Sequence, residues 1–208
     1  MKVDVFLATY NRPWQIKRFV DSVRNASHGH ELSIYVLLEE DDRESYYACE
    51  KIEGIRCIIN SSHCVPRAVN NAIKQSHSEF ILYSHDRAEF KEGFLEEPFK
   101  LVHQGYSVIG IPCGNVMPEG TFFLIRREYI EQNSCCVDIP NVIFNPNYHH
   151  YYADTELYYT STNRGVYKRC EDILTFLVHD EKAVETHIAT AEKDFEYYKS
   201  RRGLFRGV

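Results

Sequence analysis

Short apolar runs alternate with segments of helical periodicity through the first half of this chain, and no other feature limits the fold as strongly. The apolar, β-prone runs cover residues 3–8, 33–38, 55–59 and 80–83. Pro13 and Pro66 stand where helices can begin, and apolar residues follow each proline at the spacing of one helix face. Strands that alternate with helices in this way usually pair in parallel, with helices covering the sheet. The sequence therefore predicts an α/β protein.

The second half of the chain is less regular. Residues 108–111, 121–125 and 174–178 are expected to form strands, and a helix is expected from Asp154. A loop rich in Asn, Pro, His and Tyr covers residues 141–152, and a charged helix is expected over about 181–200. With 208 residues, 44% hydrophobic and 26% charged, the chain is predicted to form one domain over residues 1–208.

Charge and cysteine content exclude several classes of protein. A formal net charge of −6 argues against a general electrostatic grip on nucleic acid, although a local basic groove stays open. No apolar run approaches the roughly 20 residues that cross a bilayer. The seven cysteines are odd in number and include no CxxC pair, which indicates reduced thiols and no disulfide frame or zinc site. A soluble, cytoplasmic protein is expected.

Polar residues follow three of the predicted strands, at the point where each strand ends. They are Thr9 to Pro13 after the first strand, Glu39 to Asp42 after the second, and Ser84 to Arg87 after the fourth. In an open α/β sheet, ligands bind at the edge formed by the carboxyl ends of the strands. These segments are therefore the candidate binding site.

The order of these pieces resembles the family 2 glycosyltransferases, enzymes of the GT-A fold that use nucleoside-diphosphate sugars. The stretches that carry the resemblance are 5–13, 38–41, 67–90 and 152–157. The resemblance implies a mixed, mainly parallel sheet flanked by helices. It also implies a nucleotide-binding half over residues 1–90, an acceptor half over 91–180, and a C-terminal helix and tail over 181–208.

By this resemblance, Thr9, Tyr10 and Arg12 would lie along the nucleotide, and an arginine at this position can meet phosphate. A carboxylate after the second strand would accept a hydrogen bond from the base, a role that fits either Glu39 or Glu40. Family members usually carry Asp there, so the longer Glu leaves the base open, with a UDP-sugar as the expected donor. Arg67 is a further candidate contact to the donor. Each segment taken alone could equally be an ordinary polar turn or solvated loop.

The DxD motif of the family, whose carboxylates hold a divalent cation against the donor diphosphate, aligns here with His85, Asp86 and Arg87. Three interpretations stay open. Asp86 and His85, joined by a distant ligand such as His179, could hold Mn²⁺ or Mg²⁺. The presence of a carboxylate at a site that could otherwise be purely cationic favours this account. Alternatively, Arg87 itself neutralises the diphosphate without a metal. In the third interpretation the site is degenerate and transfers no sugar.

Asp154 stands where the family carries the base that removes the proton of the acceptor hydroxyl. An Asp at this point is also a good helix N-cap, so two roles compete. The loop just before it includes His149, His150 and neighbouring tyrosines, which suit contact with a sugar ring or a base, or simple packing. Within the ordered set of motifs, Asp154 is predicted to be the catalytic base.

The sequence thus predicts an inverting glycosyltransferase that moves one hexosyl or pentosyl group to an unknown acceptor. Candidate acceptors are a glycan, a lipid-linked or small molecule, a protein, or a modified DNA base. Nucleic acid is therefore expected as a partner only in the role of acceptor. Two rival hypotheses remain. One is a nucleotide-sugar-binding module that has lost its chemistry. The other is a sugar nucleotidyltransferase, although the chain lacks the Gly-rich, lysine-bearing first loop of such enzymes.

Overall fold

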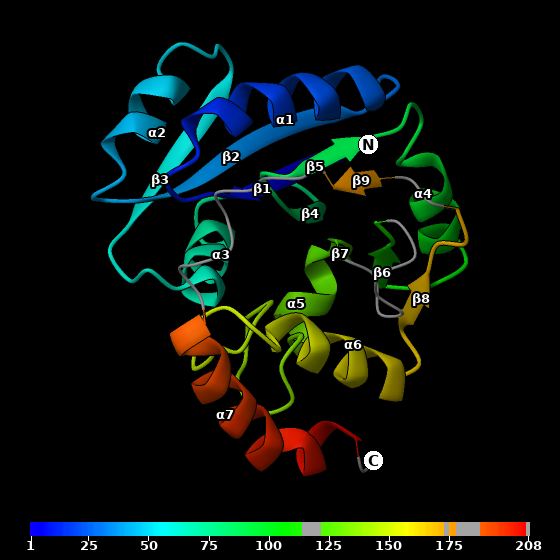
Figure 1. Ribbon diagram of the computed structural model, residues 1–208. Coiled ribbons are helices and arrows are strands. Elements are labelled where there is room, and N and C mark those ends of the chain that lie inside the picture. Colours follow the sequence, from blue (N-terminus) through cyan, green and yellow to red (C-terminus); the bar gives the residue numbers. More distant parts are fainter. Residues whose placement is uncertain (114–121, 173–174, 178–187, 207–208) are drawn as a thin grey trace.

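A computed structural model of the protein describes residues 1–113, 122–172, 175–177 and 188–206 (Figure 1). At its centre is a seven-stranded sheet of order β3-β2-β1-β4-β7-β6-β8. These strands are β1 (Lys2–Ala8), β2 (Glu31–Glu39), β3 (Ile55–Asn60), β4 (Phe80–His85), β6 (Val108–Ile111), β7 (Phe122–Arg126) and β8 (Tyr167–Arg169). A separate antiparallel pair consists of β5 (Ala88–Phe90) and β9 (Thr175–Leu177).

The sheet is mixed and mainly parallel, as predicted. β3, β2, β1 and β4 run in parallel, and β8 is parallel to β6. β7 is antiparallel to both of its neighbours, β4 and β6. All four strands of the first half consequently end at the same edge of the sheet.

Helices cover both faces of the sheet (Figure 1). One face carries α1 (Pro13–Ala26), α2 (Arg43–Cys49) and α4 (Glu96–His103). The other carries α3 (Val65–Ile73), α5 (Arg127–Asn133), α6 (Ala153–Asn163) and α7 (Ile188–Arg206). No helix within the described part of the chain is both long and apolar enough to cross a membrane.

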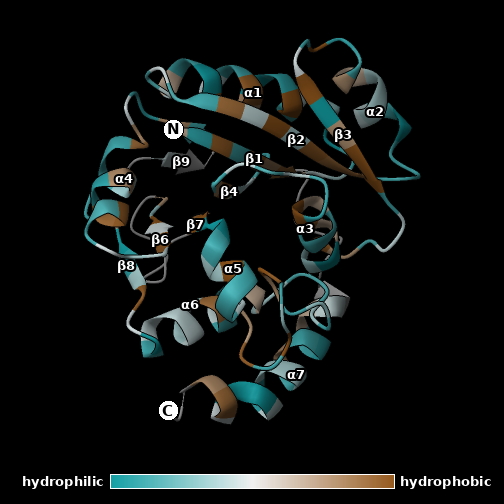
Figure 2. Ribbon diagram, turned by 180° about the vertical axis from the view of Figure 1, so that it is seen from behind, coloured by the Kyte–Doolittle hydropathy of each residue, from teal (hydrophilic) through white to brown (hydrophobic). Residues whose placement is uncertain are grey.

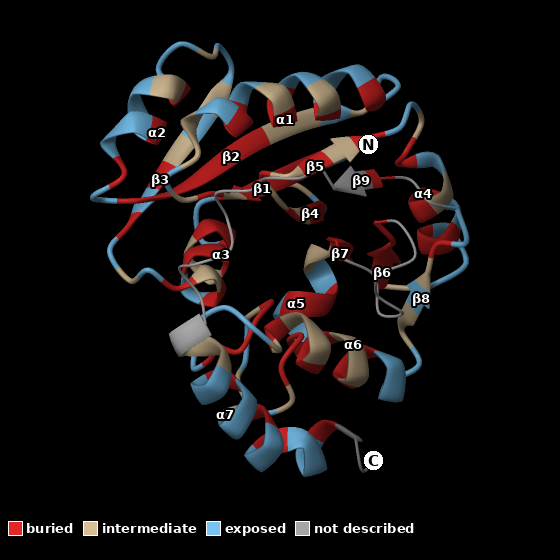
Figure 3. Ribbon diagram, viewed as in Figure 1, coloured by how far each residue is buried: buried red, intermediate tan, exposed pale blue. Residues whose placement is uncertain are grey.

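The core forms because successive side chains of each strand point to opposite faces. In β1, Val3, Val5 and Leu7 pack toward α1, whereas Phe6 packs on the opposite face with Ile81 of β4. The central strands are accordingly buried along most of their length (Figure 3), and apolar residues are concentrated on them (Figure 2). This double layer holds the loops that follow the strands in fixed positions.

Several expectations need adjustment. The strand expected over 121–125 is β7, and that expected over 174–178 is seen as the short β9, with its outer residues outside the described ranges. The final helix, expected to end near residue 200, continues to Arg206, because Phe205 is buried and packs near Tyr198. The sequence patterns did not indicate α2, α4, α5, β5 or β8, all of them short. All seven cysteines are free in the structure.

Candidate active site at the carboxyl edge of the sheet

The register of the parallel strands gathers the loops of the predicted site. Ala8, at the end of β1, lies opposite Leu37 of β2 and His85 of β4. Glu39, at the end of β2, lies opposite Asn60 of β3. The segments after β1, β2, β3 and β4 therefore meet at one edge, as the sequence pattern predicts for an open α/β sheet.

Asp86 is the centre of a polar network that ties the end of β4 to the loop after β1. Its carboxylate is 1% exposed. Thr9 Oγ1 donates to Asp86 Oδ2 over 2.8 Å, and Arg12 Nη1 lies 3.0 Å and 3.1 Å from the two carboxylate oxygens. Arg18 of α1 donates from Nη2 to the Asp86 carbonyl oxygen over 2.8 Å and pairs with Glu89 at 3.1 Å. Three residues that the sequence singled out, Thr9, Arg12 and Asp86, are thus in direct contact.

His85, the residue before Asp86, packs its ring into the protein. Its ring meets Phe122 edge-on with centroids 4.9 Å apart, and its Nδ1 is buried with no hydrogen-bond partner among the described residues. Burial, followed by the positive charge of Arg87, lowers the pKa of His85 to about 3. The imidazole is therefore neutral at physiological pH.

Arg87 follows directly and is partly exposed. Within the described ranges it forms no hydrogen bond or ion pair. Its charge acts on the buried Cys113 thiol as well: burial raises the pKa of Cys113, and Arg87 is among the groups that oppose this rise. The charge of Arg87, directly after the end of β4, thus acts on both Cys113 and His85.

The acidic run after β2 divides into separate roles. Asp42 is buried and structural: its Oδ2 accepts from the Asn11 backbone N–H at 2.6 Å, and its Oδ1 caps α2 through the Ser45 N–H at 3.1 Å. Asp41 is exposed and accepts from the Tyr10 hydroxyl at 3.0 Å. Burial and the Asp41 carboxylate raise the pKa of Tyr10. The loops after β1 and β2 are consequently joined through these two acids.

Glu39 and Glu40 are in different environments. Glu39 is buried, and its Oε2 accepts from the backbone N–H of His63 at 3.0 Å. Glu40 is exposed at the rim of a hollow of about 300 Å³, where Arg67 and Asn60 also contribute. Arg67 donates from Nε to the Pro146 carbonyl oxygen at 3.0 Å, so it links α3 to the loop ahead of α6.

Asp154 lies in the first turn of α6 and is partly buried. The helix begins at Ala153, with Tyr152 at the N-cap in the left-handed region (φ 66°), so the interpretation of Asp154 as the N-cap is wrong. Its Oδ1 accepts from the Thr155 N–H at 2.8 Å. Burial raises the pKa of Tyr83 of β4, and the charges of Asp154 and then Asp86 raise it further. Both carboxylates therefore lie near the same tyrosine, which brings α6 to the end of β4.

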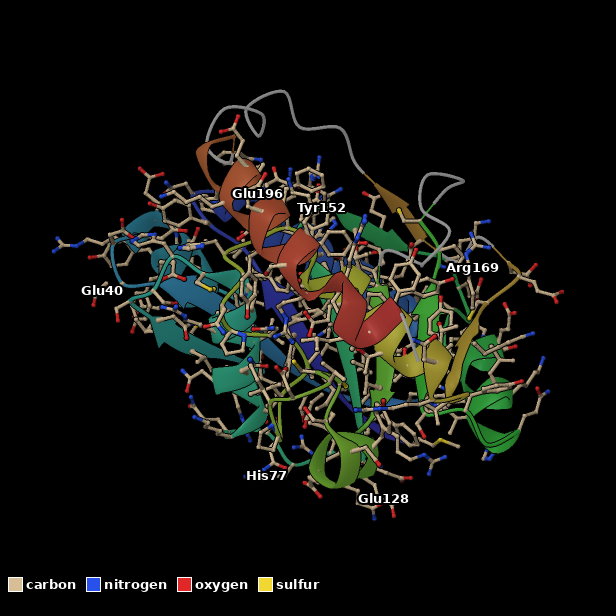
Figure 4. All side chains as sticks on the ribbon, turned by 90° about the horizontal axis from the view of Figure 1, so that it is seen from below. Glu40, His77, Glu128, Tyr152, Arg169 and Glu196 are labelled. Atoms are coloured by element: carbon tan, nitrogen blue, oxygen red, sulfur yellow. The ribbon has the colours of Figure 1, made fainter. Side chains whose placement is uncertain are left out.

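The loop that leads into α6 is held by residues that sequence patterns did not reveal. Asp194 of α7 is 1% exposed and accepts from the backbone N–H groups of His149, His150 and Tyr151 at 2.9, 2.8 and 2.9 Å. Tyr152 stacks on Tyr198 of the same helix, with centroids 4.8 Å apart, and Figure 4 shows Tyr152 beside α7. An isolated Asp in a charged helix gives no local signal for such a role.

A second cluster of ligand-type side chains, Cys136, Asp138 and Glu156, lies between α6 and α7. The Arg201 guanidinium occupies it, with Nη2 2.7 Å from Glu156 Oε1 and 2.6 Å from Asp138 Oδ1. These hydrogen bonds raise the pKa of Arg201 above its already high usual value. A cation is already present in this cluster, so it is an anchor for α7 and does not fit a metal ion.

The sheet edge fits a divalent cation equally poorly. Both oxygens of Asp86 are already paired with Arg12, and the neighbouring position holds Arg87. The pairing with Arg12 gives the Asp86 carboxylate a role that needs no metal. His179, the third candidate ligand, lies outside the described residues. The residues described at this edge do not form a metal site.

Several solved structures have a fold similar to that of this chain. Glucosyl-3-phosphoglycerate synthase from Mycobacterium tuberculosis, in complex with Mn²⁺, UDP and glucosyl-3-phosphoglycerate, has a TM-score of 0.72 at 12% identity, over 98% of this chain and 80% of that one. S. aureus TarS 1–349 in complex with UDP has a TM-score of 0.69 at 13% identity, over 98% and 72%.

The mannosyltransferase PcManGT from Pyrobaculum calidifontis, in complex with GDP-Man and Mn²⁺, has a TM-score of 0.67 at 15% identity, over 87% of this chain and 58% of that one. These similarities establish the GT-A fold. No curated protein sequence matches this chain significantly. Residues 4–174, which include the whole sheet edge and Asp154, match glycosyl transferase family 2, and the chain belongs to this family.

Proposed function

We propose that the protein transfers one sugar from a nucleoside-diphosphate sugar to an acceptor hydroxyl, with inversion at the anomeric carbon. The observation that carries the proposal is the meeting of two groups at one edge of a family 2 chain. The Thr9–Arg12–Asp86 network lies at the end of β1 and β4, and the action of both Asp154 and Asp86 on the pKa of Tyr83 supports a position of Asp154 close to it.

The donor would bind along the loop after β1. Its base would lie near the end of β2, where Glu40 lines the hollow with Asn60 and Arg67. Glu39 is the weaker candidate because its carboxylate already accepts from the His63 N–H. A uridine nucleotide is the first choice, since UDP is bound in two of the similar structures and a guanosine nucleotide in the third.

Asp154 would act as the general base. As the acceptor oxygen attacks the anomeric carbon, its proton passes to the Asp154 carboxylate, and the bond from the anomeric carbon to the diphosphate oxygen breaks on the opposite face. The nucleoside diphosphate leaves with the electron pair of that bond. Attack opposite the leaving group inverts the configuration.

Release of nucleoside diphosphate from a panel of UDP- and GDP-sugars tests the function, first with water and then with candidate acceptors. The expected result is release from at least one donor. Donor binding without release from any of them would instead indicate a binding module.

The first prediction concerns the base. Asp154→Asn should lower turnover by about 10²–10⁴-fold and leave donor affinity nearly unchanged, because only proton transfer in the transition state is lost. Kinetics of nucleotide release and calorimetry with UDP measure the two quantities. Glu128→Gln is the matched control, since Glu128 is an exposed acid on α5, far from Tyr152 in Figure 4. Equal turnover in Asp154→Asn and the unchanged protein would remove Asp154 from the mechanism.

A further inference from the structure

Diphosphate departure needs positive charge at the end of β4, and the described residues supply it from arginines. Where a protein binds a divalent cation against a diphosphate, carboxylates usually hold the cation. Such a site requires an excess of negative charge around the cation. The network around Asp86 has no such excess. Arg12, Arg18 and Arg87 stand against Asp86, Glu89 and the nearby Asp154, so three positive groups face three negative groups.

Two carboxylates of this group, those of Asp86 and Glu89, are already engaged by arginines. Asp86 is 1% exposed, and Thr9 and Arg12 together satisfy both of its oxygens. Glu89 pairs with Arg18 at 3.1 Å. A divalent cation would have to compete with these guanidinium groups for the two carboxylates.

Arg87 differs from the other two arginines. Arg12 is committed to the Asp86 carboxylate, and Arg18 to the Asp86 carbonyl oxygen and Glu89. Arg87 is partly exposed and has no ion pair among the residues the structure describes. Among these three arginines, it is therefore the one whose charge no described residue balances by an ion pair.

We propose that Arg87 binds the donor diphosphate in place of a metal ion, and that sugar transfer by this protein does not depend on a divalent cation. The inference rests on the proposed function, because it assigns the group that stabilises the leaving diphosphate. A guanidinium can meet two phosphate oxygens at once through parallel N–H donors. As the bond to the anomeric carbon breaks, the electron pair goes to the diphosphate oxygen, and Arg87 stabilises that charge without giving up a proton.

Binding of UDP to the full chain, measured by calorimetry in EDTA and again in MnCl₂, tests the inference without requiring transfer. The expected result is equal affinity within about twofold in the two buffers. Arg87→Ala should weaken UDP binding by about 10- to 100-fold in both, as expected for a lost charge-assisted contact. Uridine, which has no phosphate, should bind equally well to both proteins. Arg87→Lys should recover part of the loss, and Arg202→Ala, at an exposed arginine of α7, is the charge-matched control.

Nucleotide release in the same two buffers adds a second readout. Equal rates in EDTA and MnCl₂ support the inference. UDP binding or release that EDTA abolishes and Mn²⁺ restores overturns it, and so does an Arg87→Ala protein that binds UDP normally. Normal, Arg87-dependent UDP binding with no release from any donor would refute the proposed function but leave the diphosphate contact intact. Failure of both UDP and GDP to bind in either buffer would overturn both.

Discussion

The imidazole of His85 lies in a buried environment that disfavours its protonated, charged form. Its Nδ1 is buried without a partner among the described residues, and Phe122 lies against the ring. The folded pKa of about 3 lies below the ordinary value of 6.5. Between these values the unfolded chain takes up a proton that the folded chain refuses, so stability falls as the pH decreases through that range.

The corresponding prediction compares His85→Leu with the unchanged protein at two pH values. At pH 5 the unchanged protein should have lost up to about 2 kcal/mol through this residue, because each pKa unit corresponds to about 1.4 kcal/mol. His85→Leu should lose less between pH 7 and pH 5, since it cannot take up the proton. Urea unfolding at both pH values measures the difference. The same loss in both proteins would show that His85 is solvated and titrates normally.

At the scale of elements, α7 holds the acceptor side of the site in place. Asp194 accepts three backbone N–H groups from the loop over 149–151, and Arg201 joins α7 to Glu156 of α6. The loop ends at Tyr152, whose left-handed conformation turns the chain into α6 and sets the direction of Asp154. The position of the proposed base, Asp154, thus depends on Asp194, which lies forty residues later in α7.

Asp194→Ala should lower the free energy of unfolding by about 1–3 kcal/mol, because it leaves three part-buried N–H groups without their acceptor. It should also lower turnover more than UDP affinity. The loop over 149–151 leads to the proposed base Asp154, whereas the donor is proposed to bind along the loop after β1. Glu196→Ala is the control on the same helix: Glu196 is exposed and, within the part of the chain that the structure describes, pairs with Lys199 alone, so a change within about 0.5 kcal/mol is expected. Urea unfolding and nucleotide-release kinetics give both quantities. Equal effects of the two substitutions would contradict the anchoring role of Asp194.

At the scale of the molecule, the proposed donor site joins segments from β1, β2, β3 and β4, so a ligand there contacts most of the first half of the chain. Binding to the folded state alone stabilises the whole domain.

UDP at 100 times its dissociation constant should add about 2.7 kcal/mol to stability. For a chain of this size, that corresponds to a rise in Tm of about 5–10 °C. Thermal unfolding with and without UDP measures the shift, with GDP as the comparison nucleotide and inorganic phosphate as the control for general anion effects. An unchanged Tm with both nucleotides, at concentrations up to the millimolar range, would contradict a donor site at this edge.

Local patterns in the sequence were sufficient for the central strands and for the main helices of the first half. The short apolar runs of β1 and β2 and the helical spacing after Pro13 depend only on near neighbours, so they could be read directly. The short helices α2 and α5 were not predicted, because seven residues hold fewer than two turns of periodic pattern. The candidate residues after each strand followed from the rule that parallel strands end at one edge.

By itself, the sequence determined an α/β sheet of family 2 type and the segments that line its carboxyl edge, because both follow from local periodicity and motif order. Only the tertiary structure decided what those residues do to one another. Arg12 and Asp86 are 74 positions apart, and their pairing, which uses the one carboxylate of the aligned motif, results from the register of β1 beside β4. The contacts of Asp194 likewise exist only after α7 packs on α6. Such long-range contacts are set by burial and strand register, which leave no mark in the neighbouring residues.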